Sequence, residues 1–273
     1  MEVSIHITEQ CNLNCKACLH MIPISNHKDY YWFVSDYVKP QLELLAKHSS
    51  IVDTLVIMGG EPTLHPDIAS ILYIARELFP NIPIKLATNG VFINKFEDPE
   101  FIKSLIDNEI NVCVVAYPFS SRAEEHYSKL FNILENNNVS FSLSSIIDQN
   151  QHFLIQPFRK EINNFELKPE YCKAHHYCTM LKDNKLWVCH LAAYVDSLKE
   201  RFPELDWINV DEGAYVDLTD PNVTDELIFE KMGSFSSICT HCIEPHRGWD
   251  SDDPTEYTKW ARSEGKKEEW VRE

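Results

Sequence analysis

The feature that most constrains the fold is an alternation of short apolar runs with longer segments of helical periodicity in the first half of the chain. Runs rich in Val and Ile have the length of buried strands, and apolar residues three or four positions apart indicate helices. Strands joined by helix-length connections predict a parallel sheet with right-handed crossovers. The predicted strands are 3–8, 54–58, 82–88, 111–117 and 139–146, and the predicted helices are 32–47, 67–79 and 100–106.

The loop after the first predicted strand contains three cysteines. Parallel sheets bind ligands at the carboxyl ends of their strands, so such loops are informative. Cys11, Cys15 and Cys18 have the spacing C-x3-C-x2-C. Three thiolates this close in sequence can surround one small inorganic centre, and a four-iron cubane offers four ligand positions. The triplet predicts a cluster whose fourth iron is open to a small chelating ligand, such as the amino and carboxylate groups of an amino acid.

The loop after the second predicted strand reads Gly59-Gly60-Glu61-Pro62. Glycines let the backbone approach a ligand closely, and a carboxylate beside them can accept hydrogen bonds from an ammonium group. Alone, this turn is weak evidence, because ordinary strand-to-helix turns have the same composition. Since neighbouring parallel strands end at one rim, we expect the open iron and the ammonium acceptor to be neighbours.

Together the cysteine triplet and the Gly-Gly-Glu-Pro turn resemble the motifs of the radical S-adenosylmethionine (SAM) superfamily, over roughly residues 1–150. The resemblance implies an α/β fold of the partial (β/α)6 TIM-barrel type. It implies a [4Fe-4S] cluster on the three cysteines, which binds SAM and cleaves it reductively to a 5′-deoxyadenosyl radical that abstracts hydrogen from an unactivated carbon. The SAM-binding residues implied are Gly59, Gly60, Glu61 and Pro62 for the amine, with Thr88, Asn89 and Ser144 as candidates for the ribose or carboxylate; Ala17 replaces the family's usual aromatic residue.

A second set of cysteines lies in the last part of the chain. The residues from Asp183 to Cys189 read as a hairpin turn at Asp183-Asn184 and a strand ending in a cysteine. This stretch resembles the SPASM or shorter twitch domain of radical SAM enzymes, although Asn184 stands where that pattern has glycine; Asn tolerates the left-handed conformation well. The resemblance implies one auxiliary [4Fe-4S] cluster. Its preferred ligands are Cys172, Cys189, Cys239 and Cys242, with Cys178 substituting for Cys172 or lying near the cluster.

Zinc is the open alternative at both cysteine sets. The first set would need His20 or His27 as a fourth ligand, and Cys239-x2-Cys242 with another cysteine pair also has zinc spacing. The chain would then be a non-enzymatic zinc-binding interaction protein whose acidic segment, residues 196–226, contacts a basic partner. A further alternative binds SAM and a cluster but lacks hydrogen abstraction. Cys113, inside an apolar run, is interpreted as a buried small hydrophobic residue.

Composition narrows the compartment and the partners. The 25 Lys and Arg residues against 42 Asp and Glu give a net charge of −17, which disfavours nucleic acid. No run of apolar residues is long enough to span a membrane, and the first residues do not read as a secretory signal. We therefore expect a cytoplasmic protein. In that reducing compartment, nine cysteines indicate metal or redox chemistry more than disulfides.

These expectations define two domains and one function. Residues 1–155 are the expected radical SAM core, and residues 156–273 the expected SPASM-like or twitch-like domain with a charged tail. The hypothesis is a radical SAM enzyme that acts on a sugar-like or peptide substrate, with the auxiliary cluster accepting or relaying an electron. Its expected partner is an electron donor such as flavodoxin or ferredoxin.

Overall fold

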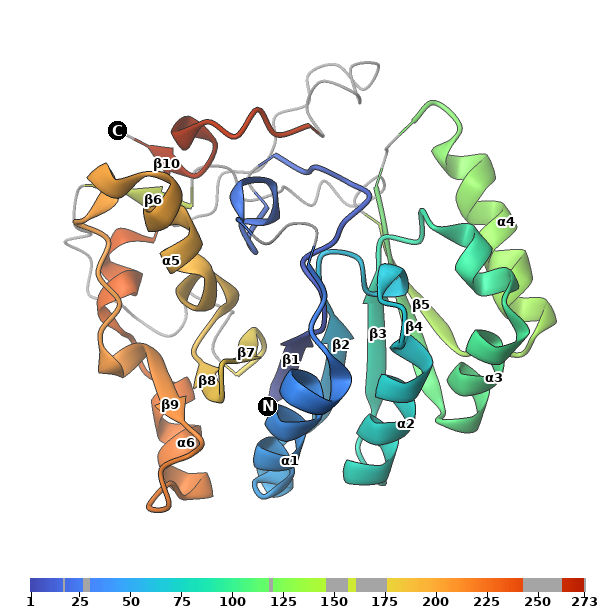
Figure 1. The fold of residues 1–273 in the computed structure, drawn as a ribbon, viewed down its shortest axis with the longest axis horizontal. Helices are drawn as coiled ribbons and strands as arrows, with labels where there is room; N and C mark the ends of the chain where they lie inside the picture. Colours follow the sequence, from blue (N-terminus) through green and yellow to red (C-terminus); the bar gives the residue numbers. More distant parts are fainter. Residues whose placement is uncertain are drawn as a thin grey trace.

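The computed structural model describes residues 1–16, 18–26, 30–117, 120–145, 157–160, 176–242 and 262–272, with the backbone alone at 144, 145 and 272. Its main element is an eight-stranded sheet in the order β5-β4-β3-β2-β1-β7-β8-β9 (Figure 1). A second sheet pairs two short strands, β6 (Phe158–Arg159) and β10 (Val271–Arg272), in parallel. The strands of the main sheet are β1 (Glu2–His6), β2 (Thr54–Met58), β3 (Ile84–Thr88), β4 (Ile110–Ala116), β5 (Phe141–Ser145), β7 (Thr179–Lys182), β8 (Lys185–Trp187) and β9 (Tyr215–Asp217).

The five predicted strands all form, and β1 to β5 pair in parallel in chain order. The predicted parallel α/β sheet is therefore confirmed, and it stays open instead of closing into a complete barrel. On the other edge of β1, β7 adds a further parallel strand, and β8 and β9 follow antiparallel. The sheet thus continues across the boundary predicted near residue 155, and that boundary stays a prediction.

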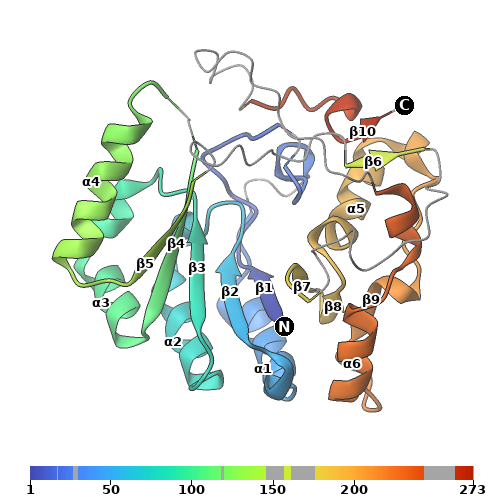
Figure 2. The same cartoon turned by 180° about the vertical axis from the view of Figure 1, so that it is seen from behind.

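Four helices alternate with the first five strands and cover one face of the sheet. In Figure 2 strands β2 to β5 lie in front of these helices, so one face of this part of the sheet is covered by helices and the other is not. A single π-helical turn at Val34–Val38 precedes the first helix, so the helix predicted over 32–47 is regular only in its second half. The helices are α1 (Lys39–Ala46), α2 (Ile68–Leu78), α3 (Pro99–Asp107) and α4 (Ala123–Asn136).

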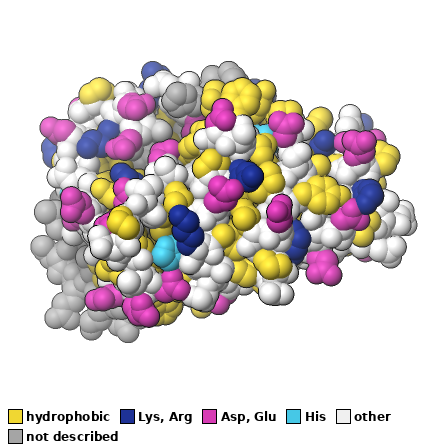
Figure 3. All heavy atoms as spheres, turned by 60° about the horizontal axis from the view of Figure 1, so that its bottom comes forward, with side chains coloured by type: hydrophobic (Ala, Val, Ile, Leu, Met, Phe, Trp, Pro, Cys, Tyr) yellow, Lys and Arg dark blue, Asp and Glu magenta, His cyan; other side chains and the backbone are white. Residues whose placement is uncertain are grey.

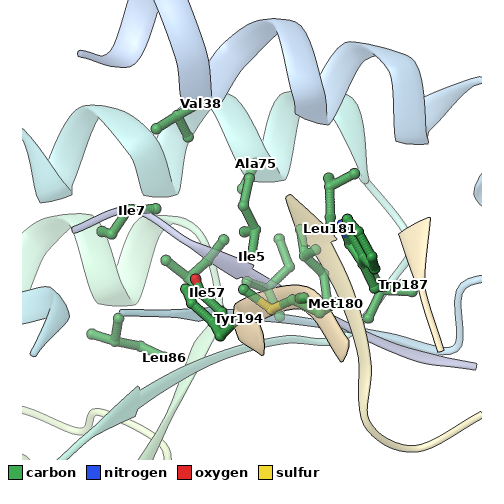
Figure 4. Close-up of a cluster of buried hydrophobic side chains, with 14 of the residues drawn as sticks. Ile5, Ile7, Val38, Ile57, Ala75, Leu86, Met180, Leu181, Trp187 and Tyr194 are labelled. Atoms are coloured by element: carbon green, nitrogen blue, oxygen red, sulfur yellow. The ribbon is translucent and has the colours of Figure 1, made fainter. Parts of the chain in front are cut away.

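Apolar residues on the helix-covered face form the core. Along β3, Ile84, Leu86 and Thr88 are buried while Lys85 and Ala87 are partly exposed, as the period of two requires. Figure 4 shows apolar side chains from the central strands, from the segment around α1 and α2, and from a later helix gathered in one cluster. Cys113 of β4 lies on the opposite face, whose side chains are partly exposed, so its interpretation as a buried hydrophobic residue was wrong.

The second half of the chain packs onto the β7 side of the sheet through α5 (His190–Arg201) and α6 (Asp225–Met232). The β7–β8 hairpin turns at Asp183 and Asn184, whose φ angles of 54° and 60° are left-handed, as expected for this turn. The acidic segment 196–226 contains β9 and buried apolar residues such as Ile208 and Val216. Short 3-10 turns lie at Ile22–Ile24, Ser49–Ile51, Pro62–Leu64, Ile93–Glu97, Pro203–Leu205, Glu212–Ala214, Ser237–His241 and Lys267–Glu269.

The surface carries both signs of charge despite the net excess of acid. On the face shown in Figure 3, acidic and basic side chains are interspersed with apolar ones, and no continuous basic area is seen there. In the part of the chain that the structure describes, none of the helices combines the length and the apolar character needed to cross a bilayer.

Arg76 of α2 connects three chain segments through backbone carbonyls. Its guanidinium donates to the oxygens of Phe79 (3.0 Å), Ile82 (2.9 Å) and Asn108 (2.8 Å), with a longer bond to Pro80. We expect Arg76→Lys to lower the free energy of unfolding by about 1.5–3 kcal/mol, because an ammonium cannot reproduce the planar fork.

Urea denaturation measures this effect. The matched control is Lys103→Ala, which removes only an exposed ion pair with Asp107 and should cost less than about 1 kcal/mol. Equal stability of the two variants would contradict the bracing role of Arg76.

Candidate functional site

The three amino-terminal cysteines lie together at the carboxyl edge of the sheet, in the loop after β1. Burial, together with negative charge at Glu61 and Cys18, raises the pKa of Cys11 to about 12. Burial also raises the pKa of Cys15, with added effects from Cys18 and Cys11. The three thiols therefore lie within electrostatic range of one another, and their role as cluster ligands stays a prediction.

Backbone N–H groups surround the sulfur of Cys18. Burial raises its pKa, and hydrogen bonds from the N–H groups of His20, Ile22 and Met21 oppose that rise. Met21 has a left-handed φ of 57°, and successive N–H groups around such a residue form a concavity that binds anions. Hydrogen bonds to sulfur are a normal feature of thiolates that ligate iron-sulfur clusters. The residues present therefore fit a cluster on these three cysteines.

The Gly-Gly-Glu turn packs directly on the backbone that leads into Cys11. The Gly60 N–H donates to Thr8 O and the Glu61 N–H to Gln10 O, each at 2.7 Å. A Cβ on Gly59 would lie 2.6 Å from Thr8 O, and one on Gly60 would lie 2.3 Å from Gln10 O. Both positions require glycine because the two loops touch backbone to backbone.

Glu61 is fully buried, and its carboxylate joins the loops after β2 and β3. It accepts from Thr63 N (3.1 Å), Thr63 Oγ1 (2.6 Å), Thr88 Oγ1 (2.6 Å) and Asn89 N (2.8 Å). Burial raises the pKa of Glu61, and these four hydrogen bonds act in the opposite direction. Three of these donors meet Oε1 and one meets Oε2, so donors of the chain itself use most of the carboxylate's roughly four acceptor sites. The geometry gives this carboxylate a structural task that the sequence did not indicate.

The loop after β3 is tied to the cysteine loop. Asn89 Nδ2 donates to Asn12 Oδ1 at 2.8 Å and lies 4.0 Å from Cys11 Sγ. Thr88 is buried with its hydroxyl directed at Glu61. The structure thus places Thr88 and Asn89 at the predicted rim, and Pro62 starts the 3-10 turn beside them. Ser144 lies on β5 with its side chain outside the described atoms, and Ala17 is also outside the described residues.

Tyr117 follows β4 at the same edge, at the end of the fourth predicted strand, where the sequence is compatible with either a cavity-lining or a packing residue. Burial raises the pKa of its phenol, and negative charge at Cys15, Cys18 and Cys11 raises it further, which places the ring close to the cysteines. Its N–H donates to Tyr127 Oη at 2.9 Å, and that hydroxyl donates to Asn89 O.

A buried imidazole cluster, made of His6, His20 and His190, lies between the cysteine loop and α5. Tyr194 Oη is 2.5 Å from His6 Nδ1, and His20 Nε2 is 2.8 Å from His190 Nδ1. Burial lowers the pKa of all three histidines, that of His190 to about 4, so the rings are neutral at neutral pH. The Nε2 atoms of His6 and His190 are buried and have no hydrogen-bond partner among the described residues. No motif predicted this cluster.

The carboxy-terminal cysteines lie on separate elements. Cys189 caps α5, and its sulfur accepts from Ala192 N–H at 3.5 Å. Cys239 lies in the 3-10 turn Ser237–His241, and Cys242 follows this turn. The Cys242 N–H donates a hydrogen bond to Cys239 O at 3.3 Å. Cys178 precedes β7. Cys172 lies outside the described residues, so the ligand set of the auxiliary cluster stays a prediction.

Within the described ranges, no three His, Cys, Asp or Glu side chains converge so that they could hold one metal ion. The zinc alternative needs such convergence, since a zinc ion takes four ligands on a single centre. In a cubane each thiolate binds a different iron, so the cysteines need not converge on one point. His27, a candidate fourth ligand in the zinc alternative, lies outside the described residues, and the cluster on Cys11, Cys15 and Cys18 stays a prediction.

Comparison with known proteins supports the resemblance to the radical SAM superfamily that the sequence motifs indicated. The family model of the Radical SAM superfamily matches residues 5–139. A 7,8-dihydro-6-hydroxymethylpterin dimethyltransferase of Methanocaldococcus jannaschii is 29% identical over 124 residues, 45% of this chain and 23% of the relative. An S-adenosylmethionine-dependent nucleotide dehydratase of Selenomonas ruminantium is 33% identical over 89 residues, 33% of this chain and 30% of the relative. The matched parts thus span less than a third of these curated relatives.

A solved structure shares the fold over most of the chain. The crystal structure of BtrN in complex with AdoMet and 2-DOIA has a TM-score of 0.52 and 15% identity, and the match covers 88% of this chain and 92% of BtrN. The segment matched by the family model contains the cysteine triplet, the Gly-Gly-Glu turn and strands β2 to β4. The chain therefore carries a radical SAM domain, which spans residues 5–139.

Proposed function

We propose that this chain is a radical SAM enzyme that abstracts hydrogen from a carbon of a sugar-like or peptide substrate. The observation that carries the proposal is the gathering of Cys11, Cys15 and Cys18 beside the Gly-Gly-Glu turn at the carboxyl edge of a parallel sheet. A [4Fe-4S] cluster bound there would supply the electron that splits SAM into methionine and a 5′-deoxyadenosyl radical. The AdoMet named in the BtrN complex supports SAM as the ligand.

The chain's own groups prepare the site for that chemistry. The turn formed by Gly59, Gly60 and Glu61 lies against the backbone before Cys11, so a ligand on the open iron would contact it. The Glu61 network holds this turn and the loop of Thr88 and Asn89 in one arrangement before any ligand binds. Such preorganised dipoles need no rearrangement during reaction.

The substrate would lie over the partly exposed face of the sheet. Lys85, Cys113 and Ser142 belong to this face, which the helices do not cover (Figure 2). Lys85 pairs with Glu2 at 2.8 Å, so the face offers charged, hydroxyl and thiol groups beside small apolar side chains such as Ala87. Polar groups of this kind support a substrate rich in hydrogen-bonding atoms, such as a sugar or a peptide.

An auxiliary [4Fe-4S] cluster is the second part of the proposal, held by Cys189, Cys239, Cys242 and either Cys172 or Cys178. The cap position of Cys189 on α5 supports its role as a thiolate ligand. An electron donor of the flavodoxin or ferredoxin class would provide the electron for SAM cleavage, and a cytoplasmic location is part of the same proposal.

Metal analysis of anaerobically purified protein tests the proposal as a whole. We expect iron and sulfide in nearly equal amounts and a brown colour. A colourless preparation with zinc at both sites would favour the zinc-binding interaction protein instead. Iron, sulfide and SAM binding without 5′-deoxyadenosine, whichever substrate is offered, would favour the member that lacks hydrogen abstraction.

We expect Cys15→Ala to abolish formation of 5′-deoxyadenosine from SAM under a strong reductant, because the cluster loses one of three ligands. Chromatography of anaerobic reaction mixtures measures the product. Iron analysis of the same preparations compares Cys15→Ala with Cys113→Ala, which removes a thiol outside both cysteine sets and should leave the iron content unchanged, whereas Cys15→Ala should lower it. Full SAM cleavage by Cys15→Ala would refute the assignment of that residue.

Glu61→Gln should weaken SAM binding and lower the free energy of unfolding by about 1–3 kcal/mol. The substitution puts an amide donor among backbone N–H donors from Thr63 and Asn89, which leaves one of them without an acceptor. Urea denaturation and equilibrium dialysis with SAM measure the two effects. Glu97→Gln, at an exposed pair with Lys129, is the control and should change neither; an unchanged Glu61→Gln protein would argue against the network.

Cys239→Ala should remove the auxiliary cluster and keep the first one. We expect iron per chain to fall by about half, while SAM cleavage continues but is no longer coupled to a product, because the two cysteine sets lie on different elements. Iron analysis and the spectrum of the reduced protein provide the measurement. An iron content equal to that of the unmodified chain would remove Cys239 from the ligand set.

A further inference from the structure

The carboxy-terminal segment, residues 262–272, lies against the cysteine loop, and we call it the strap. Figure 1 shows it in red beside the loop in blue. Ser263 N–H donates to Asn14 O at 2.7 Å, and Asn14 Nδ2 donates to Ser263 O at 2.9 Å. These two bonds close a ring with the residue that immediately precedes Cys15, so the strap fixes that residue's backbone and side chain together.

A second anchor of the strap is Trp270, whose side chain is completely buried. Its indole Nε1–H donates to Cys18 O at 2.9 Å, and the same oxygen accepts from Met21 N–H at 3.0 Å. The carbonyl of Cys18 begins the turn whose N–H groups surround the sulfur of Cys18. The indole therefore fixes the Cys18 carbonyl, which lies at the start of the turn whose N–H groups surround the Cys18 sulfur.

The strap is itself an ordered unit. The buried carboxylate of Glu269 accepts from Ser263 Oγ (2.6 Å), Glu264 N–H (2.7 Å) and Lys266 N–H (3.4 Å). Its end forms β10, which pairs with β6. Because these bonds already order the strap, its contacts with the cysteine loop do not have to offset the entropy cost of ordering it.

Polar contacts join the strap to the loop at separate points. A cleft of about 500 Å³ lies between the strap and the segment that follows the cysteines, with Arg201 at its border. The lining residues are Asn14, Pro23, Ile24, Ser25, Asn26, Arg201, Ser263, Glu264 and Gly265. The hydrogen bonds at Asn14 and Cys18, with the buried indole of Trp270, attach the strap to the loop beside this cleft.

We propose that Trp270 is a positioning residue for the Cys18 ligand, and that the Asn14–Ser263 pair supports it in keeping the loop in its cluster-binding conformation. This inference rests on the proposed function, because it requires a cluster on the three cysteines. Groups that orient ligands tune a metal centre and its retention. A single hydrogen bond contributes enough to change the rate of cluster loss about two- to tenfold.

The test compares Trp270→Phe with Trp187→Phe in the full chain carrying Cys239→Ala, so that one cluster is observed. Phe keeps an aromatic ring and lacks the N–H. Trp187 is also a buried indole that donates to a backbone carbonyl, that of Lys182 at 3.1 Å, but it lies in β8. We expect Trp270→Phe to lose cluster iron to a chelator two- to tenfold faster and to show an altered paramagnetic resonance spectrum with SAM, and Trp187→Phe to match the parent.

Asn14→Asp provides a second variant near the surface, where folding does not depend on core packing; it removes the donor to Ser263 O. We expect Asn14→Asp to lose cluster iron to the chelator two- to tenfold faster as well, and this variant tests the proposal even if Trp270→Phe fails to fold. Iron loss and spectra equal to the parent in both variants, or equal acceleration in Trp187→Phe, would overturn the positioning role. A parent protein that takes up no cluster would instead refute the proposed function, which is a distinguishable result.

Discussion

The site depends on the backbone contact between the loop before Cys11 and the Gly-Gly-Glu turn. Ile7 N–H donates to Met58 O, and the bonds of Gly60 and Glu61 to this loop continue the β1–β2 pairing past the ends of both strands. Strand register therefore fixes the position of the cysteine loop relative to the turn. A slip of one residue would turn every side chain of β1 to the opposite face and separate the two motifs. The core packing that sets the register, with Ile5 and Ile57 fully buried, is thus a condition of function.

A buried carboxylate extends this arrangement to a third strand. Glu61 has no exposed surface, and isolated ionised carboxylates are costly to bury, so its hydrogen bonds to Thr63, Thr88 and Asn89 are needed for it to remain there. The same bonds tie the loop after β3 to the loop after β2. Asn89 then reaches Asn12 in the cysteine loop. Three consecutive strands therefore contribute to one network, and parallel sheets allow this because their carboxyl ends share an edge.

The sequence predicted what depends on local pattern. Short apolar runs rich in Val and Ile predicted β1 to β5, and the left-handed preference of Asn agrees with the turn at Asn184. C-x3-C-x2-C with Gly59-Gly60 predicted two neighbouring loops, and the structure places these loops in backbone contact. Long-range choices could not be found in this way. The pairing of β7 with β1 joins residues far apart in the chain, and the imidazole cluster takes His6 and His190 from distant elements. In segment 196–226 the frequent acidic residues concealed the apolar ones that β9 and its neighbours bury.

The second half of the chain completes the cysteine loop. β7 pairs with the edge of β1 that β2 leaves open. Tyr194 is hydrogen-bonded to the buried ring of His6, and His190 is hydrogen-bonded to His20, two residues after Cys18. The strap adds contacts at Asn14 and Cys18. Without these elements β1 would be an exposed edge strand and buried polar groups around the loop would lose their partners, both of which are unfavourable. The residues that hold the amino-terminal cysteines in place therefore come from both sides of the boundary predicted near residue 155, so the radical SAM motif and the carboxy-terminal half form one structural unit at this site.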